Sequence, residues 1–399
     1  MSDSVLILGA SGVIGSGVVK HLAQSRPDVS VVGGDLDDAG DAISRLGEAI
    51  SFEIVDVTDH RSLDDALTGV DVVVNCVGPF HRFGPTVLEA TIESGVDYLD
   101  VCDDYDTVDP LLSLHNRAVD AGTTAVVGLG ASPGVTNVLV SLAENQLDTV
   151  TDVSINVTRS ILARAGPAIP YHVFNSWLGE VPTYTDGERM TVRALRDGRH
   201  VVEFPEPFGH REVYHFGHPE SLTLPRAFDA LENVSVRGTF TPPSFRDALL
   251  DVENLGLLDE EPVSVAGIDV QPVEFAAAML ERIGARVAME AGEFPDGGAI
   301  VVEVEGKTDG NRKRQRFAGT STMQGATSKA VAIGVEFLLD GKLSGAPGVW
   351  SPEAVVPPEP YIRRLLEEPE MEFWAGSFGE MTPERFQAIM ENDSFQRDY

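Results

Sequence analysis

Two side chains in the N-terminal third are of the kind that moves a proton. His81 follows the short turn Val77–Phe80, and a histidine titrates near neutral pH, as a general acid or base should. Asp103 follows an apolar run, where its carboxylate could act as a base or hold an amine. His81 and Asp103 are therefore our candidate catalytic residues. A surface loop histidine and a solvated acidic turn are the competing interpretations, and for Asp104 the solvated turn is favoured.

A second group of residues could hold a substrate. Arg82 could pair with a carboxylate through two hydrogen bonds, although a surface ion pair is the simpler interpretation in so acidic a chain. The small residues of the turn Gly130–Gly134 would let a ligand approach the backbone. The expected substrate-binding residues are Arg82, Tyr105, Ser132, Pro133, Gly134, Asn137 and Trp177. Other residues that could line the same pocket are Tyr171, His172, His215 and His218.

Metal and thiol chemistry are less favoured. A metal site could be formed by His210, His215 and His218 if all three lay on one helix. Glycine and proline interrupt that segment and would break such a helix, so we expect no metal. Cys76 and Cys102 are interpreted as small core residues rather than nucleophiles.

The segment Gly9–Gly15 has the spacing of a phosphate-binding turn. It follows the apolar run Val5–Leu8 and begins a helical pattern, which is the context that such a turn requires. Gly9 permits the tight turn, Gly12 lets the backbone approach a pyrophosphate, and Gly15 lets the helix press on the sheet. The free N–H groups of the helix then face the phosphates. A purely structural turn is the competing interpretation.

Residues at the next strand ends extend this site. Asp35 lies twenty residues after Gly15, where an acidic side chain binds the ribose hydroxyls of a dinucleotide. A carboxylate there repels the 2′-phosphate of NADP, and Leu36–Asp38 contains no arginine, so the sequence predicts NAD, with NADP less favoured. Asp56 and Val57 would lie near the adenine ring. The expected cofactor-binding residues are Gly9, Ser11, Gly12, Val13, Ile14, Gly15, Asp35, Asp56, Val57, Cys76, Val77, Gly78, Pro79 and Phe80.

A parallel sheet would bring these residues together. From residue 4 to about 130, short apolar runs alternate with helical patterns, which predicts an α/β fold: a Rossmann-type, doubly wound parallel sheet with helices on both faces. The expected strands are 4–8, 29–33, 51–55, 71–76, 97–101 and 124–127.

Beyond residue 150 the pattern predicts a mixed α+β substrate domain with an antiparallel sheet and helices on one side. Asp186-Gly187 and Asp197-Gly198 predict hairpin turns, and 307–312 predicts a third turn between strands 299–305 and 313–320. Further elements are expected as a strand at 232–240, helices after Ser244 and Pro272, and a small-residue helix at 325–339. The expected parts are a Rossmann domain (1–135), the substrate and dimerisation domain (136–322), a helix returning to the Rossmann domain (323–357) and a surface tail (358–399).

The composition restricts the partners. The chain has 63 acidic and 29 basic residues and a net charge of -34. Such a charge repels nucleic acid and anionic lipid, so we expect neither as a partner. It suits a surface that stays hydrated in concentrated salt and indicates a halophilic archaeon; a moderately acidic mesophilic enzyme is the alternative. With two cysteines, no leader pattern and no apolar run of about 20 residues, the sequence predicts a cytoplasmic protein.

Three motifs resemble those of the saccharopine dehydrogenase-like family: Asn75–Phe80, Gly95–Asp104 and Gly128–Gly134. The resemblance continues more weakly through His218–Arg226 and Gly325–Leu339. It implies an N-terminal cofactor domain, a mixed α+β substrate domain and a late helix that returns to the first domain. Members of this family act at carbon–nitrogen bonds. The resemblance therefore implies an NAD(P)-dependent dehydrogenase or reductase for a small polar amine, imine or amino-acid-like substrate.

One departure concerns the substrate. Family members that act on amino acids carry an acidic residue before Pro-Gly and an Asp-His pair after it, whereas this chain has Ser132, Thr136 and Asn137. The departure weakens the case for lysine or saccharopine more than the case for the reaction class.

Other functions share the glycine turn. A short-chain reductase needs a tyrosine followed four residues later by lysine, and none of the seven tyrosines meets this condition. A dinucleotide-binding sensor or scaffold without catalysis stays open, as does a reductase of C=C or C=O bonds. A homodimer is expected, because hairpin-rich substrate domains often supply dimer interfaces.

Overall fold

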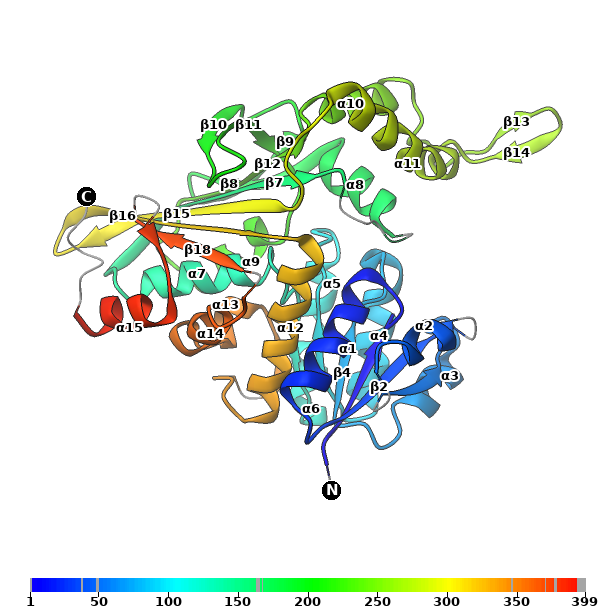
Figure 1. The fold of residues 1–399 in the computed structure, drawn as a ribbon, viewed down its shortest axis with the longest axis horizontal. Helices are drawn as coiled ribbons and strands as arrows, with labels where there is room; N and C mark the ends of the chain where they lie inside the picture. Colours follow the sequence, from blue (N-terminus) through cyan, green and yellow to red (C-terminus); the bar gives the residue numbers. More distant parts are fainter. Residues whose placement is uncertain are drawn as a thin grey trace.

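The computed structural model describes residues 2–36, 39–47, 50–162, 166, 168–345, 347–369, 371–376 and 379–392. Two large sheets lie one above the other, and residues of both line a shared cavity (Figure 1). Among the described residues, no helix combines the length and apolar character needed to cross a membrane.

The first sheet is the predicted Rossmann-type sheet. Its seven strands are parallel, in the order β17-β6-β5-β4-β1-β2-β3. Val5 and Ile7 pack with helices on one face, and Leu6 and Leu8 pack with helices on the other, so the strands are apolar along their length. The six predicted strands are confirmed to within two residues at their ends. They are β1 (Ser4–Leu8), β2 (Ser30–Asp35), β3 (Ser51–Ile54), β4 (Val72–Asn75), β5 (Asp97–Asp100) and β6 (Thr124–Val126).

Helices separate these strands. They are α1 (Val13–Ser25), α2 (Gly40–Ser44), α3 (His60–Ala66), α4 (Phe80–Glu93), α5 (Val108–Leu112), α6 (His115–Ala121) and α7 (Val135–Glu144).

Two elements of the first layer come from the end of the chain. The seventh strand, β17 (Gly348–Trp350), pairs with β6. Helix α12 (Met323–Leu339) packs against α1 so closely that a Cβ on Gly17 would lie 2.3 Å from Oγ of Ser328. The late small-residue helix therefore does return to the cofactor domain.

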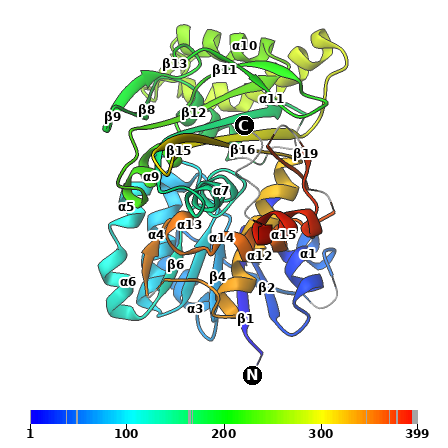
Figure 2. The same ribbon diagram turned by 90° about the vertical axis from the view of Figure 1, so that its left-hand side faces the viewer.

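The second sheet is mixed rather than antiparallel. β12 pairs with β7 in parallel, while β15 pairs with β7 and β16 in antiparallel. The expectation of helices on one side was wrong as well: α10 and α11 lie above the sheet and α7 lies below it (Figure 2). Its strands are β7 (Thr149–Ser160), β8 (Glu180–Thr185), β9 (Glu188–Arg193), β10 (His200–Glu203), β11 (His210–His215), β12 (Asn233–Thr241), β15 (Gly298–Thr308), β16 (Asn311–Ser321), β18 (Glu372–Ala375) and β19 (Gly379–Glu380). Its helices are α8 (Ile169–Trp177), α9 (Glu220–Ala227), α10 (Ser244–Asn254) and α11 (Pro272–Ala291), and a separate ribbon is formed by β13 (Val263–Val265) and β14 (Ile268–Val270).

The hairpin predictions had different outcomes. Asp186-Gly187 joins β8 to β9, and Asp309-Gly310 joins β15 to β16, as the turn residues predict. The hairpin at Asp197-Gly198 was wrong, because β9 pairs with β8 and β10 pairs with β11.

Between residues 358 and 392, the described residues do not form the surface tail that the sequence predicted. Helix α14 (Pro358–Leu365) buries Tyr361, Ile362 and Leu365 against the core, and β18 adds a strand to the second sheet. Two further helices, α13 (Pro352–Val355) and α15 (Pro383–Asn392), flank these elements. The domain boundaries at 135, 322 and 357 stay predictions.

Candidate active site

A cavity of about 560 Å³ lies between the two sheets. Its lower part is formed by the carboxyl ends of the parallel strands, which is where doubly wound sheets bind ligands. Its upper part is formed by β7, β15, β16 and α8 of the second domain. One continuous space thus reaches from the glycine turn to the histidines of the second domain.

The glycine turn has the geometry that a pyrophosphate site requires. Gly9 has a φ of 74°, a conformation that suits glycine. A Cβ on Gly15 would lie 2.2 Å from the carbonyl oxygen of Gly9, so α1 contacts the turn directly. Gly9 and Gly12 line the cavity, together with Ser11, Val13 and Ile14, whereas Gly15 lies behind them. The free N–H groups at the start of α1 thus face the cavity.

Asp35 lies at the end of β2 and lines the same part of the cavity. Its carboxylate accepts hydrogen bonds from the backbone N–H groups of Ser11 (2.9 Å) and Leu36 (2.9 Å). Lys and Arg are absent from the described residues that line this end. Asp37 and Asp38, which add negative charge in the sequence, lie outside the described residues. Asp35 therefore presents a carboxylate at this end of the cavity with no described cation beside it.

Other predicted cofactor residues also line the cavity. Asp56 and Val57 lie beside the end of β3, and Cys76, Val77, Gly78, Pro79 and Phe80 form the turn after β4. Burial raises the pKa of Cys76 to about 12, which argues against a thiolate nucleophile. This turn lies between the glycine turn and the polar groups described next.

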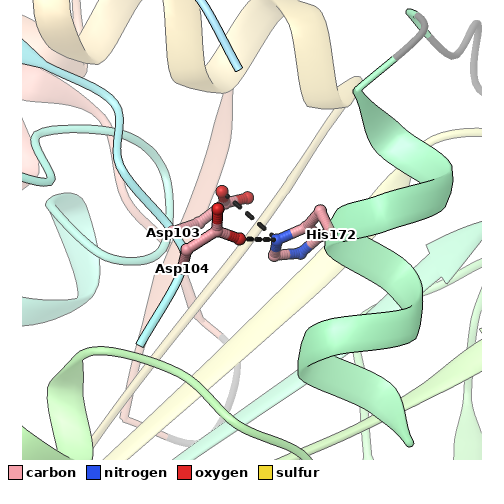
Figure 3. Close-up of side chains that lie close together, drawn as sticks. All are labelled: Asp103, Asp104 and His172. Carbon is pink, nitrogen blue, oxygen red and sulfur yellow. Dashed lines mark hydrogen bonds and ion pairs between the residues drawn. The ribbon is translucent and has the colours of Figure 1, made fainter. Parts of the chain in front are cut away.

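A buried carboxylate and a histidine from different domains meet in the lining of the cavity. Oδ1 of Asp104, in the loop after β5, lies 3.0 Å from Nδ1 of His172 on α8 (Figure 3). Oδ1 of Asp103 lies 3.3 Å from the same nitrogen. Because Asp104 is 1% exposed, its interpretation as a solvated turn was wrong. The expected role of Asp103 stays a prediction, but the structure adds His172 and Asp104 as partners.

The charges in this cluster depend on each other. Burial lowers the pKa of His172, but Asp103 and Asp104 outweigh it and hold the pKa of this imidazole above its ordinary value. Burial raises the pKa of Asp104, but hydrogen bonds with His172 and His81 hold it well below its usual range. Nδ1–H of His172 therefore donates to an ionised Asp104. This leaves Nε2, which has no hydrogen-bond partner among the described residues, available to a ligand.

His81 lies outside the cavity lining. It is in the first turn of α4 rather than in a loop, and its side chain is 33% exposed. Its Nδ1 lies 3.4 Å from Oδ2 of Asp104. The hydrogen bond with Asp104 raises the pKa of His81. His81 is thus connected to His172 through a shared carboxylate, but it has no access to the cavity of its own.

A second carboxylate–histidine pair lies nearby. Nδ1 of His218 is 2.5 Å from Oε2 of Glu220, which is fully buried. The other oxygen of Glu220 accepts hydrogen bonds from the hydroxyls of Ser132 (2.6 Å) and Thr136 (2.7 Å). The rings of His172 and His218 are 6.5 Å apart. Ser132 and Thr136 are neutral where relatives that act on amino acids have charged residues. Glu220 of the second domain therefore places a carboxylate beside these two neutral side chains.

Arg159 on β7 is a cation that the sequence reading missed. Its side chain lines the cavity, and its pKa is lowered by burial, which the charge of Asp103 partly offsets. Trp177 and Phe216 stack with ring centres 4.0 Å apart and form an apolar wall of the same space. No local motif marks Arg159, because a single arginine in a strand is usually a surface residue.

Five of the predicted substrate residues do not line the cavity. Arg82 lies 5.3 Å above the ring of Tyr171, and Tyr105 packs against the backbone of Gly217. Pro133, Gly134 and Asn137 build the turn into α7, where Oδ1 of Asn137 accepts a hydrogen bond from the N–H of Gly134 (2.9 Å). Ser132 and Trp177 do line it. The roles of the other five as substrate-binding residues stay predictions.

The comparisons with known proteins agree with this arrangement. The family model "Saccharopine dehydrogenase NADP binding domain" matches residues 5–126, and "Saccharopine dehydrogenase C-terminal domain" matches residues 130–370. The chain belongs to the saccharopine dehydrogenase family. The first model indicates a nicotinamide dinucleotide as the cofactor of this family member, and the glycine turn and Asp35 provide suitable groups for it.

Individual relatives in the saccharopine dehydrogenase family are distant. The rat saccharopine dehydrogenase-like oxidoreductase is 24% identical over 220 residues, which is 50% of each chain. The chain thus matches about half the length of such relatives. Carboxyaminopropylagmatine dehydrogenase of Synechocystis is 23% identical over 91% of this chain and 95% of the relative. The saccharopine dehydrogenase (L-Glu forming) of Saccharomyces cerevisiae has the same fold, with a TM-score of 0.64 at 17% identity, over 94% of this chain and all of that chain.

The polar cluster also has the composition of a metal site. One ligand atom from each of Asp103, Asp104 and His172 lies within 4.8 Å of the others. The donation from Nδ1–H of His172 to Asp104 accounts for this geometry without an ion. The absence of a metal stays a prediction.

Proposed function

We propose that this protein is a nicotinamide-dependent oxidoreductase that acts on the CH–NH bond of a small polar substrate. One observation carries the proposal: a single cavity joins the glycine turn and Asp35 to the imidazole of His172. When bound, the nicotinamide ring accepts or donates a hydride. The reaction then needs from the protein an aligned substrate, a dry pocket and one group that moves a proton.

His172 is the residue that we assign to proton transfer. In the oxidative direction, Nε2 of its neutral imidazole accepts the proton from the substrate nitrogen. Asp104 fixes the tautomer by accepting from Nδ1–H and stabilises the imidazolium that forms. His218, held by Glu220, can hydrogen-bond the substrate from the other side. In this proposal His172 takes the proton-transfer role that the sequence suggested for His81. Asp103 acts as a negative charge beside His172 rather than as the base.

Arg159 is assigned to an anionic group of the substrate. A guanidinium in a partly closed cavity binds a carboxylate through paired hydrogen bonds. The stacked Trp177 and Phe216 would cover an aliphatic portion. The name of the Synechocystis relative, a dehydrogenase of a carboxyaminopropyl compound, supports a substrate with both an amine and a carboxylate.

We propose NAD rather than NADP as the preferred cofactor. Asp35 carries the argument, because the described lining around it offers no cation for a 2′-phosphate. The name of the matching domain favours NADP, so the preference must be measured.

Calorimetric titration with NADH and NADPH tests the first requirement of the proposal, which is that the protein binds a nicotinamide dinucleotide. We expect NADH to bind at least tenfold more tightly and Asp35→Ala to reduce this preference. Asp35→Asn removes the charge and keeps one acceptor oxygen, so it retains at most one of the two hydrogen bonds from the N–H groups of Ser11 and Leu36. Absorbance of NADH at 340 nm in the presence of NAD and a panel of secondary amines with carboxylates then tests catalysis. A parallel assay with NADH and a panel of alkenes and ketones tests the alternative reductions. Binding without turnover in either assay would support a sensor, oxidation of NADH only with alkenes or ketones would support another reductase, and no binding would refute the proposal.

A further inference from the structure

A two-stranded ribbon projects from the second domain and pairs with neither large sheet. β13 and β14 extend beyond the rest of the molecule at the right of Figure 1. The pairing register puts four apolar side chains on one face of the ribbon, namely Val263, Val265, Ile268 and Val270. Of these, Val263, Val265 and Ile268 are 51%, 55% and 68% exposed. An isolated ribbon of this kind is marginally stable in water, so its apolar face needs a partner.

The helix that follows the ribbon has an exposed stripe as well. Five exposed residues of α11 recur at steps of three and four and so share one face: Phe275, Ala278, Arg282, Ala285 and Met289. Phe275 and Met289 are 53% and 78% exposed. The opposite face, with Ala276, Ala277, Leu280 and Val287, is buried in the domain. The exposed stripe therefore takes no part in the packing of α11 against its own domain.

The stripe is symmetric about Arg282. Phe275 and Met289 each lie seven residues from it, and Ala278 and Ala285 lie four and three residues from it. When two copies of α11 pair in antiparallel around Arg282, large residues face large ones and alanines face alanines. The two Arg282 side chains then meet near the axis, and each is long enough to reach Glu281 of the other copy, which offsets the repulsion between the two guanidinium groups. This complementarity of a surface with itself is what a two-fold interface requires.

We propose that α11 and the β13–β14 ribbon form the interface with a second copy of this chain. The two copies of α11 pair in antiparallel about a two-fold axis at Arg282, and the apolar face of each ribbon covers part of the other copy. A helix of 20 residues is about 30 Å long and 10 Å wide. It supplies less than the roughly 800 Å² per partner of a stable interface, so both elements are needed.

The charges around the stripe favour a second copy over a membrane. Among the exposed charges on and beside the stripe, Glu274, Glu281 and Glu290 outnumber Arg282 and Arg286, so the net charge there is negative and would repel anionic lipid. Two copies with a net charge of -34 each also repel, but dissolved salt screens this repulsion over about 10 Å or less at 0.1 M and above.

Sedimentation equilibrium and light scattering in 1 M KCl test the interface. We expect a wild-type dimer whose dissociation constant rises at least tenfold in Met289→Glu and in Ile268→Glu. Met190→Glu is the matched control, because Met190 is also exposed (49%) but lies on β9. The introduced carboxylates are in solvent in the single chain, so circular dichroism and melting should show an intact fold in all three variants.

A charge exchange tests the two-fold geometry itself. Arg282→Glu should weaken the dimer by placing four carboxylates at the axis, and the double variant Glu281→Arg with Arg282→Glu should restore it. A monomeric wild type at 50 µM would overturn the proposal, and so would a dimer that both glutamate variants leave unchanged. Failure of the charge exchange to restore association would overturn the antiparallel pairing. None of these measurements depends on cofactor or substrate.

Discussion

Asp104 and His172 form a hydrogen bond of 3.0 Å between residues 68 positions apart, one from each domain. The carboxylate is almost fully buried, and the imidazole lines the cavity. The candidate proton-transfer group is thus oriented by a domain to which it does not belong. Several measurements can examine this relationship and the groups around it.

Replacement of His172 should stop proton transfer without loss of the cofactor. We expect His172→Gln to reduce kcat by about 10²- to 10⁴-fold, which is the usual contribution of a general base. Binding of NADH, measured by calorimetry, should stay within about twofold, because the glycine turn and Asp35 are unchanged. His60→Gln is the control, as His60 is exposed on α3. Retention of activity in His172→Gln would contradict the assignment.

The pH dependence should follow the pKa of His172. Asp103 and Asp104 raise this pKa against the effect of burial, and the oxidative reaction needs the neutral imidazole. The rate should therefore fall as the pH decreases through a value above the ordinary pKa of histidine. Asp104→Asn removes one of the two carboxylates and should move this limb to lower pH. A limb that does not move in the pH profile of kcat/KM would show that another group titrates.

His81 should influence His172 from outside the cavity. Protonated His81 competes for Asp104, so His81→Gln should leave more of the carboxylate's charge to His172 and raise the pKa of His172. Titration of the histidine resonances by NMR measures this without a substrate. The groups that also act on the two imidazoles are Asp103, Asp106, Arg82 and Arg159, and none of them is altered. An unchanged titration of His172 would mean that the two imidazoles are independent.

Loss of Arg159 should affect substrate binding more than turnover. Arg159→Gln should raise KM for a carboxylate substrate by about tenfold or more, since a charged hydrogen-bonding partner contributes roughly 1.5–3 kcal/mol. Arg159→Lys keeps the charge but loses the paired geometry, so we expect a smaller increase. Steady-state kinetics with a substrate and its carboxamide analogue would check the assignment. Equal losses for both compounds would count against a contact with the carboxylate.

The stability of the chain should decrease in acid through Glu336. Burial raises the pKa of this residue, but the nearby His21 and Ser25 and the hydrogen bonds from Arg364 outweigh it and lower the pKa from 4.5 to about 2. A lowered pKa in the folded state adds stability above pH 4.5 that is lost as the pH falls toward 2. The shift corresponds to at most about 3 kcal/mol. Urea unfolding at pH 7 and pH 3 should show a smaller difference for Glu336→Gln than for wild type, whereas Glu359→Gln, in an exposed pair with Arg363, should resemble wild type.

Local patterns in the sequence predicted the features that depend on residues close together in the sequence. The glycine turn, Asp35 and the strand–helix alternation lie within short segments, so periodicity and turn residues predicted them. The β15–β16 hairpin was predicted for the same reason, because its register depends on one tight turn.

The features that were missed depend on contacts between distant segments. β7 and β12 pair in parallel without a shared turn, and nothing local marks the pairing. His172 meets Asp104 only when the two domains pack together. A signal did exist for α14, where Tyr361, Ile362 and Leu365 have helical spacing, but the surrounding glutamates and prolines resembled a surface segment.

The position of β17 and α12 has a consequence for the synthesis of the protein. A ribosome releases the chain from its N-terminus, so the first six strands of the Rossmann sheet emerge long before residues 323–350. Until then, the edge strand β6 has no outer neighbour and the face of α1 around Gly17 has no cover. The cofactor domain therefore cannot be completed until the ribosome has translated the whole second domain. A chain that stalls in the second domain leaves an open sheet edge, which is a target for chaperones and proteases.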